Sequence, residues 1–244
     1  MTEKVVPYKT SESGKKEQVA EMFDNIAGNY DFLNTFLSLG IHYSWRKKAI
    51  RKLTELRPVK MLDIATGTAD FAIAALRLNP EQVTGVDISE GMLQLGREKI
   101  AKKGLQSRIQ LQLADSEHLP FADATFDAIT VGFGVRNFEH LEKGLQEMAR
   151  VLRPGGMAVV LEFSKPDHWL IKRLYAFYFN YITPLIGRIF SKDKAAYTYL
   201  PASVEAFPSG LAFSSIMERC GFIQAKVHPL QGGIASIYTG IKKQ

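Results

Sequence analysis

The 244-residue sequence predicts an α/β fold built on a mostly parallel β-sheet. Three observations lead to this prediction. From Val59 onward, apolar runs of strand length alternate with helical segments. A turn of small residues (65–69) joins the first predicted strand to a helix, and the next strand ends on Asp87, twenty residues after Gly67. Near the C-terminus, two strand-like runs joined by a Gly-Gly turn predict a closing antiparallel hairpin.

Composition favours a single globular domain spanning 1–244. Apolar residues make up 46% of the chain, which is enough for a sizeable core. Cys220 is the one cysteine, so we expect no internal disulfide and a reducing, cytoplasmic setting. The polar N-terminus lacks the apolar core of a secretory signal, and we expect disorder over 1–15. The net charge of +6 permits contact with an anionic membrane surface, but no nucleic-acid-binding module is evident, so no nucleic-acid partner is expected.

A helical cap over 16–57 is expected in front of the sheet. Four apolar residues fall on one face at helical spacing: Val19, Met22, Phe23 and Ile26. We expect Gly28 to end the first helix, a second helical piece to reach Leu39, and Ser44 to cap a third helix that ends before Pro58.

The rest of the chain supplies the elements of the sheet domain. Parallel strands are predicted at 59–64, 82–87, 108–114, 125–131 and 156–163. Helices are predicted at 69–79, 90–103, 139–153 and 209–220. The runs 222–228 and 236–242 complete a seven-stranded sheet like that of the Rossmann-like methyltransferases.

An aromatic-rich insertion at 165–208 separates the fifth strand from the last helix and is too long for a simple crossover. Its charges and Pro184 argue against a membrane span. Two interpretations remain open: a lid that packs on the domain, and an apolar face that meets lipid or an apolar substrate.

The turn at 65–69 favours an adenosine-bearing cofactor without phosphate. A dehydrogenase needs glycines where Ala65 and Asp70 stand, and an acid there would repel pyrophosphate. Gly67 and Thr68 leave room for the methionyl part of S-adenosylmethionine, and Asp87 can accept hydrogen bonds from ribose hydroxyls.

Two further segments follow strands at the ligand-binding edge of the predicted sheet. After the third strand, Asp115 can accept from the adenine amino group and the Ser116 backbone can donate to the ring. After the fourth strand, Gly132 permits close approach, and Arg136 with Asn137 lies at the mouth of the cleft. The five histidines lack metal-ligand spacing, so no metal is expected, and neither a hydrolase elbow nor a P-loop is present.

Several of these stretches resemble the ubiquinone/menaquinone biosynthesis C-methyltransferase family, from about residue 16 to the C-terminus. The resemblance is carried by residues 30–34, 37–38, His42-x-x-Trp45, 65–70, 133–137, 150–156, 162–164 and 232–236. The segments 30–45 and 150–164 are the most specific. Departures are mild: Leu33 stands where Met is usual, Arg153 where Lys is usual, and Ala69 where glycine is common.

The resemblance implies S-adenosylmethionine as methyl donor and a ring carbon of a polyprenylated quinol as acceptor, with demethylmenaquinol favoured over a ubiquinone-pathway benzoquinol. It matches Thr68, Asp87, Asp115 and Ser116 to cofactor contacts, with Gly132 as a further position facing the cofactor. We expect Arg136 to favour the phenolate and Asn137 to orient the ring or a water. Tyr197 or Tyr199 could assist, and a packing role for both tyrosines remains open. The apolar tail implies a visit to the inner face of the membrane.

Rival classes remain open at this point. One is a nucleotide-dependent oxidoreductase, and another is a non-catalytic quinone-binding protein of the same fold. A small-molecule O- or N-methyltransferase would not explain the 30–45 segment. The sequence does not determine the oligomeric state.

Overall fold

A computed structural model describes residues 5–166, 169, 171–173 and 195–243. Its centre is a seven-stranded sheet in the order β3-β2-β1-β4-β5-β7-β6. The strands are β1 (Lys60–Ile64), β2 (Gln82–Asp87), β3 (Ile109–Leu113), β4 (Phe126–Gly132), β5 (Leu152–Phe163), β6 (Phe222–Leu230) and β7 (Ala235–Lys242). The first five run parallel, and β7 pairs antiparallel with both β5 and β6. The predicted parallel sheet with a closing hairpin is confirmed.

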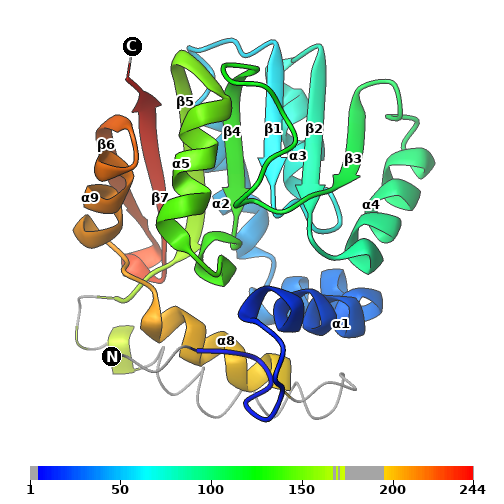
Figure 1. Ribbon diagram of the computed structural model, residues 1–244, viewed down its shortest axis with the longest axis vertical. Coiled ribbons are helices and arrows are strands. Elements are labelled where there is room, and N and C mark those ends of the chain that lie inside the picture. Colours follow the sequence, from blue (N-terminus) through cyan, green and yellow to red (C-terminus); the bar gives the residue numbers. More distant parts are fainter. Residues whose placement is uncertain (1–4, 167–168, 170, 174–194, 244) are drawn as a thin grey trace.

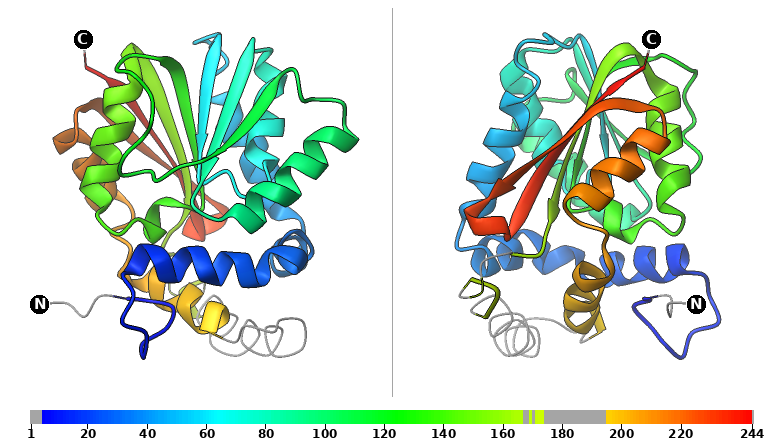
Figure 2. Two further views of the ribbon diagram at one scale, coloured as in Figure 1. Left: turned by 45° about the vertical axis from the view of Figure 1, so that its right-hand side comes forward. Right: turned by 90° about the vertical axis from the view of Figure 1, so that its left-hand side faces the viewer.

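Helices cover both faces of this sheet (Figures 1 and 2). One layer contains α2 (Ile41–Arg51), α3 (Asp70–Ala75) with the 3-10 turn η1 (Leu76–Leu78), and α4 (Glu90–Lys102); the other contains α5 (Leu141–Val151) and α9 (Leu211–Arg219). Successive residues of β1 serve the two layers: Met61 packs with the cluster around α2 and α3, whereas Leu62 packs with the cluster around α5 and α9. Burial on both faces explains why the parallel strands read as continuous apolar runs.

Two helices close the carboxyl end of the parallel strands. In Figure 1, α1 (Lys15–Leu37) and α8 (Ala195–Ala206) run beneath the sheet at the end to which its parallel arrows point. Val19 and Met22 of α1 pack with Ala196 and Tyr199 of α8 in a small core of their own. The cap and the sheet therefore enclose the edge at which open α/β sheets bind ligands.

The cap differs from the prediction in its helix boundaries. Helix α1 continues through Gly28 to Leu37, because a single glycine costs a helix only about 1 kcal/mol. Gly40 adopts a left-handed conformation (φ 72°) and starts α2 at Ile41, so Ser44 lies inside that helix instead of capping it. Helix α2 ends at Arg51, earlier than expected.

Two segments next to the cap were predicted to be disordered or to form an insertion. Residues 5–14, which were expected to be disordered, lie along α1, where the Tyr8 amide donates to Gln18 Oε1 at 2.9 Å. Residues 1–4 and 174–194, the latter at the centre of the predicted aromatic insertion, lie outside the described residues. None of the helices within the described ranges has the length and apolar character that crossing a bilayer requires.

Candidate functional site

The turn after β1 is held in an unusual backbone conformation. Ala65, Gly67 and Ala69 all have positive φ, at 52°, 54° and 65°. Ala69 therefore adopts the conformation for which glycine is common, and this conformation costs about 1–2 kcal/mol for each alanine. A Cβ placed on Gly67 would have no atom within 4 Å, so space is open beside this turn. The turn presents bare backbone to that space.

Asp87, at the end of β2, is tied to this turn. Its Oδ2 accepts from the Gly67 amide at 2.8 Å, and its Oδ1 accepts from the Ser89 amide at 3.0 Å. Burial raises the pKa of the Asp87 carboxyl, against the effect of these two amides. A carboxylate has about four lone-pair sites, so Asp87 can still accept a hydrogen bond from a ligand.

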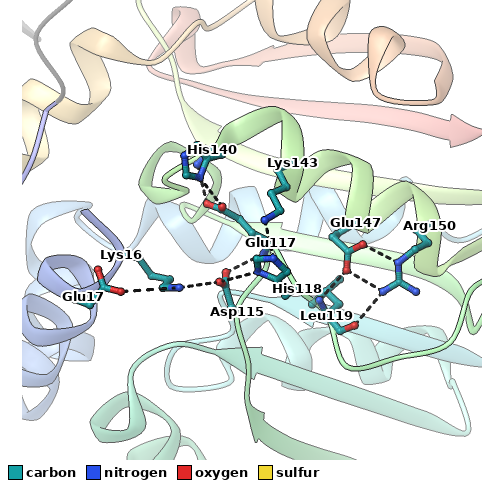
Figure 3. Close-up of polar contacts among 10 residues, drawn as sticks. All are labelled: Lys16, Glu17, Asp115, Glu117, His118, Leu119, His140, Lys143, Glu147 and Arg150. Atoms are coloured by element: carbon teal, nitrogen blue, oxygen red, sulfur yellow. Dashed lines mark hydrogen bonds and ion pairs between the residues drawn. The ribbon is translucent and has the colours of Figure 1, made fainter. Parts of the chain in front are cut away.

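The loop after β3 is fixed by polar contacts to α1 and to α5 with its N-cap His140 (Figure 3). Asp115 accepts from the Glu117 amide at 2.9 Å and from Lys16 of α1 at 3.2 Å. Although burial acts in the opposite direction, these two donors hold the pKa of Asp115 below its usual range. The buried Glu117 carboxylate accepts from the backbone amide of His140 at 2.7 Å and contacts its ring at 2.8 Å.

A narrow cleft runs between the turn, this loop and the cap. Five of the six predicted cofactor residues line it: Gly67, Asp87, Asp115, Ser116 and Gly132. In the described part of its lining, four carboxylates accompany one lysine: Asp87, Asp115, Glu117, Glu139 and Lys16. Such a lining disfavours a phosphate and suits a nucleoside that carries sulfonium and ammonium charges. These residues fit S-adenosylmethionine better than a dinucleotide.

The cleft adjoins a larger chamber of about 510 Å³ whose walls are mainly apolar. The two spaces share six lining residues: Phe23, Tyr30, Ala65, Gly67, Gly132 and Phe133. One wall is formed by the motif segment 30–45, which contributes Tyr30, Asn34 and Ser38 from one stripe of α1 and its C-cap, and His42 and Trp45 from α2. The arrangement provides an apolar compartment beside the nucleoside cleft.

Arg136 and Asn137, the predicted catalytic pair, lie where the two spaces meet. Arg136 lines the chamber and Asn137 lines the cleft. The Arg136 guanidinium contacts Glu162 of β5 at 2.8 Å and also donates to the Phe133 carbonyl. Among the described residues, its Nε is the one fully buried side-chain nitrogen or oxygen that has no hydrogen-bond partner.

Tyr199, which was named from the sequence as a possible assistant to this pair, contacts Asn137. The Tyr199 hydroxyl donates to Asn137 Oδ1 at 3.1 Å. Burial raises the pKa of Tyr199 to about 12, so its hydroxyl is protonated at neutral pH. The side chain of Tyr197 lies outside the described part of the structure.

Thr68 is the sixth predicted cofactor residue. It lines the chamber, its hydroxyl donates to Asp31 of α1 at 2.6 Å, and it accepts from Lys99 of α4 at 2.9 Å. Lys99 also pairs with Asp31 at 2.6 Å and with Asp70 at 2.7 Å, while Arg46 of α2 pairs with Asp70 at 2.9 Å. Asp70 thus joins α2, α3 and α4 where a dehydrogenase has glycine.

Sequence reasoning missed Glu162 and His42 as site residues. Glu162 lies 26 positions from Arg136, and only the adjacency of β4 and β5 brings the two together. The available signal for His42 was its place in the motif His42-x-x-Trp45, although its lack of metal-ligand spacing suggested a structural role. Within the described ranges, no group of three or more His, Cys, Asp or Glu residues is arranged to hold a metal ion.

Comparison with solved structures supports the fold. A SAM-dependent methyltransferase from Thermotoga maritima matches with a TM-score of 0.63 at 20% identity, covering 92% of this chain and 99% of that one. Phosphoethanolamine N-methyltransferase 2 from Haemonchus contortus, solved with S-adenosyl-L-methionine, matches with a TM-score of 0.55 at 16% identity, covering 76% of this chain and 49% of that one. At these identities the likeness concerns the fold.

Sequence comparison shows the family as well as the fold. A demethylmenaquinone methyltransferase from Bacteroides fragilis is 51% identical over 242 residues, with 98% of each chain covered. A ubiquinone/menaquinone biosynthesis C-methyltransferase from Geotalea daltonii is 48% identical, covering 96% of this chain and all of that one. The model of the ubiE/COQ5 methyltransferase family matches residues 11–242. The chain therefore belongs to the ubiE/COQ5 methyltransferase family, and it is an enzyme of the methyl-transferring class.

Proposed function

We propose that this enzyme methylates a ring carbon of a polyprenylated quinol, converting demethylmenaquinol to menaquinol with S-adenosylmethionine as methyl donor. The observation that carries the proposal is the apolar chamber of about 510 Å³ adjoining the acid-lined cleft. Such a chamber suits a large aromatic acceptor with an isoprenoid tail. The names of the relatives from Bacteroides fragilis and Geotalea daltonii support the same substrate class.

The cleft residues would hold the methyl donor. Asp87 would accept from the ribose hydroxyls, Asp115 and Ser116 would meet the adenine edge, and the backbone at Gly67 and Gly132 would allow close approach. When bound, S-adenosylmethionine supplies a methyl group made electrophilic by its sulfonium.

Arg136 and Asn137 would prepare the acceptor. A ring carbon becomes nucleophilic when the neighbouring hydroxyl loses its proton, and the guanidinium of Arg136 favours that anionic form in an enclosed site. Asn137, held by Tyr199, orients the ring, since alignment of the reacting atoms contributes several orders of magnitude in rate.

Two variants test these roles separately. Asp87→Ala should raise the Kd for S-adenosylmethionine at least tenfold in isothermal titration, because the ribose acceptor is removed. Arg136→Lys should lower kcat at least tenfold with an unchanged Kd, because lysine keeps the charge but not the planar donor set. Arg136 would be removed from the mechanism by two results together. Arg136→Lys would keep the wild-type kcat, and any loss of rate in Arg136→Ala would be explained by a smaller folded fraction of that variant.

Product analysis with labelled S-adenosylmethionine tests the acceptor. We expect methylation of demethylmenaquinol. Methylation of a demethylated benzoquinol instead would assign the ubiquinone pathway, and the name of the Geotalea daltonii relative covers both quinones. Absence of transfer to either quinol would contradict the proposed acceptor.

We also infer a peripheral contact with the membrane at the corner between α1 and α2. Leu39 is 83% exposed and Tyr43 is 55% exposed, and Leu39 and Ile41 line the chamber. Lys47 and Arg51 follow Tyr43 at four-residue intervals on the exposed face of α2. An apolar corner beside basic side chains suits an anionic lipid surface, from which a polyprenyl tail enters the chamber at low cost.

A further inference from the structure

We propose that Ser38 and His42 form a second polar subsite of the chamber, which binds the quinol oxygen opposite the methylated side of the ring. The inference rests on the proposed function and adds a specificity determinant to it. Arg136 meets the hydroxyl next to the reacting carbon, and His42 meets the para oxygen, so that the chamber selects a 1,4-dihydroxylated ring over a monophenol.

The contact between Ser38 and His42 determines which ring nitrogen is available. His42 is 6% exposed and lines the chamber. Its Nδ1 lies 2.5 Å from Ser38 Oγ, which occupies that nitrogen. Among the described residues Nε2 has no hydrogen-bond partner, so it is the nitrogen that can meet a ligand.

Several other polar groups of the chamber wall are already paired within the protein. Trp45 Nε1 donates to Gln231 Oε1, and Arg46 pairs with Asp70 at 2.9 Å. Thr68, as described above, is held by Asp31 and Lys99. By contrast, Nε2 of His42 and the buried Nε of Arg136 have no hydrogen-bond partner among the described residues.

Three aromatic rings of the chamber wall, those of Phe133, Phe163 and Trp45, pack against one another. The Arg136 guanidinium lies 5.6 Å from the centroid of the Phe163 ring, and Trp45, one helical turn after His42, lies 6.5 Å from the same ring. Phe133 completes the group, with its centroid 4.6 Å from Phe163 and 6.2 Å from Trp45. A quinol ring stacked on these side chains could direct one hydroxyl to Arg136 and the other to His42, since both residues line the same chamber.

A purely structural role for the same bond is testable. Ser38 is the C-cap of α1, so its bond to His42 also ties α1 to α2. If that were its whole role, loss of the bond would lower stability and slow every acceptor alike. A ligand contact predicts a loss restricted to acceptors that carry the para hydroxyl.

The experiment measures the effect of each substitution on two acceptors, in a cycle that combines one mutation with one change of acceptor. One is a short-chain demethylmenaquinol, and the other is the prenylated 1-naphthol that lacks the para hydroxyl but keeps the hydroxyl next to the reacting carbon. The two differ in intrinsic reactivity, and comparing each variant with the wild type on the same acceptor cancels this difference. His42→Phe should lower kcat/KM about tenfold on the quinol, the effect of one lost hydrogen bond, and less than twofold on the naphthol.

Matched variants keep the test decisive. His42→Gln, which retains a polar group, should recover part of the loss, and Ser38→Ala should show a smaller loss of the same selectivity. His228→Phe, a half-buried histidine of β6 outside both spaces, should leave both acceptors unaffected. The Kd for S-adenosylmethionine should stay constant throughout.

Two outcomes would overturn the inference. One is an equal loss of kcat/KM on both acceptors in His42→Gln and Ser38→Ala. The other is that neither variant loses kcat/KM on either acceptor. Failure of the wild-type enzyme to methylate either acceptor would instead refute the proposed function.

Discussion

The guanidinium of Arg136 and the carboxylate of Glu162 form an ion pair 2.8 Å apart, with the Arg136 side chain 8% exposed and that of Glu162 fully buried. Glu162 also accepts from the Phe163 amide at 2.8 Å, which fixes the carboxylate relative to β5. Burial raises the pKa of Glu162, and the adjacent Arg136 charge opposes that rise. Glu162 therefore positions Arg136 at the chamber wall.

Replacing Glu162 should affect both stability and turnover. Glu162→Gln leaves the buried Arg136 charge without its counter-ion, so we expect about 3 kcal/mol of destabilisation in chemical denaturation. A freed guanidinium should also lower kcat about tenfold, with an unchanged Kd for S-adenosylmethionine. Glu205→Gln is the control, since Glu205 is 80% exposed and pairs with Lys165 at the surface. Wild-type kcat in folded Glu162→Gln would contradict the positioning role.

Asp63 should make stability depend on pH. It is buried in β1, where it accepts from Thr66 and Thr130, each at 2.6 Å, and burial raises its pKa from 3.8 to about 6. Between these values the folded protein holds a proton that the unfolded chain has lost, so stability falls as pH rises through the window. The contribution is fully present below about pH 4, and about 3 kcal/mol is lost above pH 6.

Asp63→Asn, which cannot titrate, checks this expectation. The difference in unfolding free energy between wild type and variant should change by that amount between pH 4 and pH 7 in urea titrations. A constant difference across this range would show that the Asp63 pKa is not raised.

Lys99 should stabilise the packing of the helical cap on the sheet domain. It joins Asp31 of α1 to Thr68 and Asp70 across contacts of 2.6 to 2.9 Å. Lys99→Met should destabilise the protein by about 1–2 kcal/mol, because it removes two partly exposed ion pairs and a hydrogen bond. It should also raise KM for the quinol, because α1 forms a chamber wall. Lys102→Met, on an exposed position of the same helix, should change neither quantity.

Gly67 should be sensitive to substitution mainly through the ligand. Gly67→Ala would require alanine at φ 54°, which costs about 1–2 kcal/mol, and the neighbouring Ala65 and Ala69 already tolerate similar angles. The new methyl group would meet no protein atom within 4 Å but would project into open space beside the cleft. We expect a folded protein whose Kd for S-adenosylmethionine is raised at least tenfold, measured by calorimetry. An unchanged Kd would place the cofactor elsewhere.

Leu39 should contribute to membrane contact. Leu39→Glu replaces an 83% exposed apolar side chain at the α1–α2 corner with a charge, and should weaken binding to anionic vesicles about tenfold, because burying a leucine contributes about 1.5–3 kcal/mol. The control is Leu211→Glu, at a 75% exposed position of α9. Equal co-sedimentation of the two variants and the wild type would rule out this corner as the docking surface.

The chemical pattern along the chain was sufficient to predict the sheet and much of the cleft. Periodicity identified all seven strands, because parallel strands buried on both faces leave continuous apolar runs. The residues that follow strand ends, such as Asp87 and Asp115, were identifiable because carboxyl ends of parallel strands meet at one edge. Local spacing was less informative in the cap, where Gly28 and Ser44 suggested boundaries that long-range packing overrode.

The acceptor chamber, by contrast, depends on contacts between distant segments. The pairing of β4 with β5 brings Glu162 close to Arg136. The packing of α1 against α4 places Asp31 and Lys99 within hydrogen-bond distance of the Thr68 hydroxyl. The amino-acid sequence alone determined the strands, the turn and the family motifs, because these depend on local conformation and side-chain chemistry. Only the tertiary structure decided which polar groups are already paired and which remain available to a ligand, because hydrogen bonding and burial are properties of the packed neighbourhood.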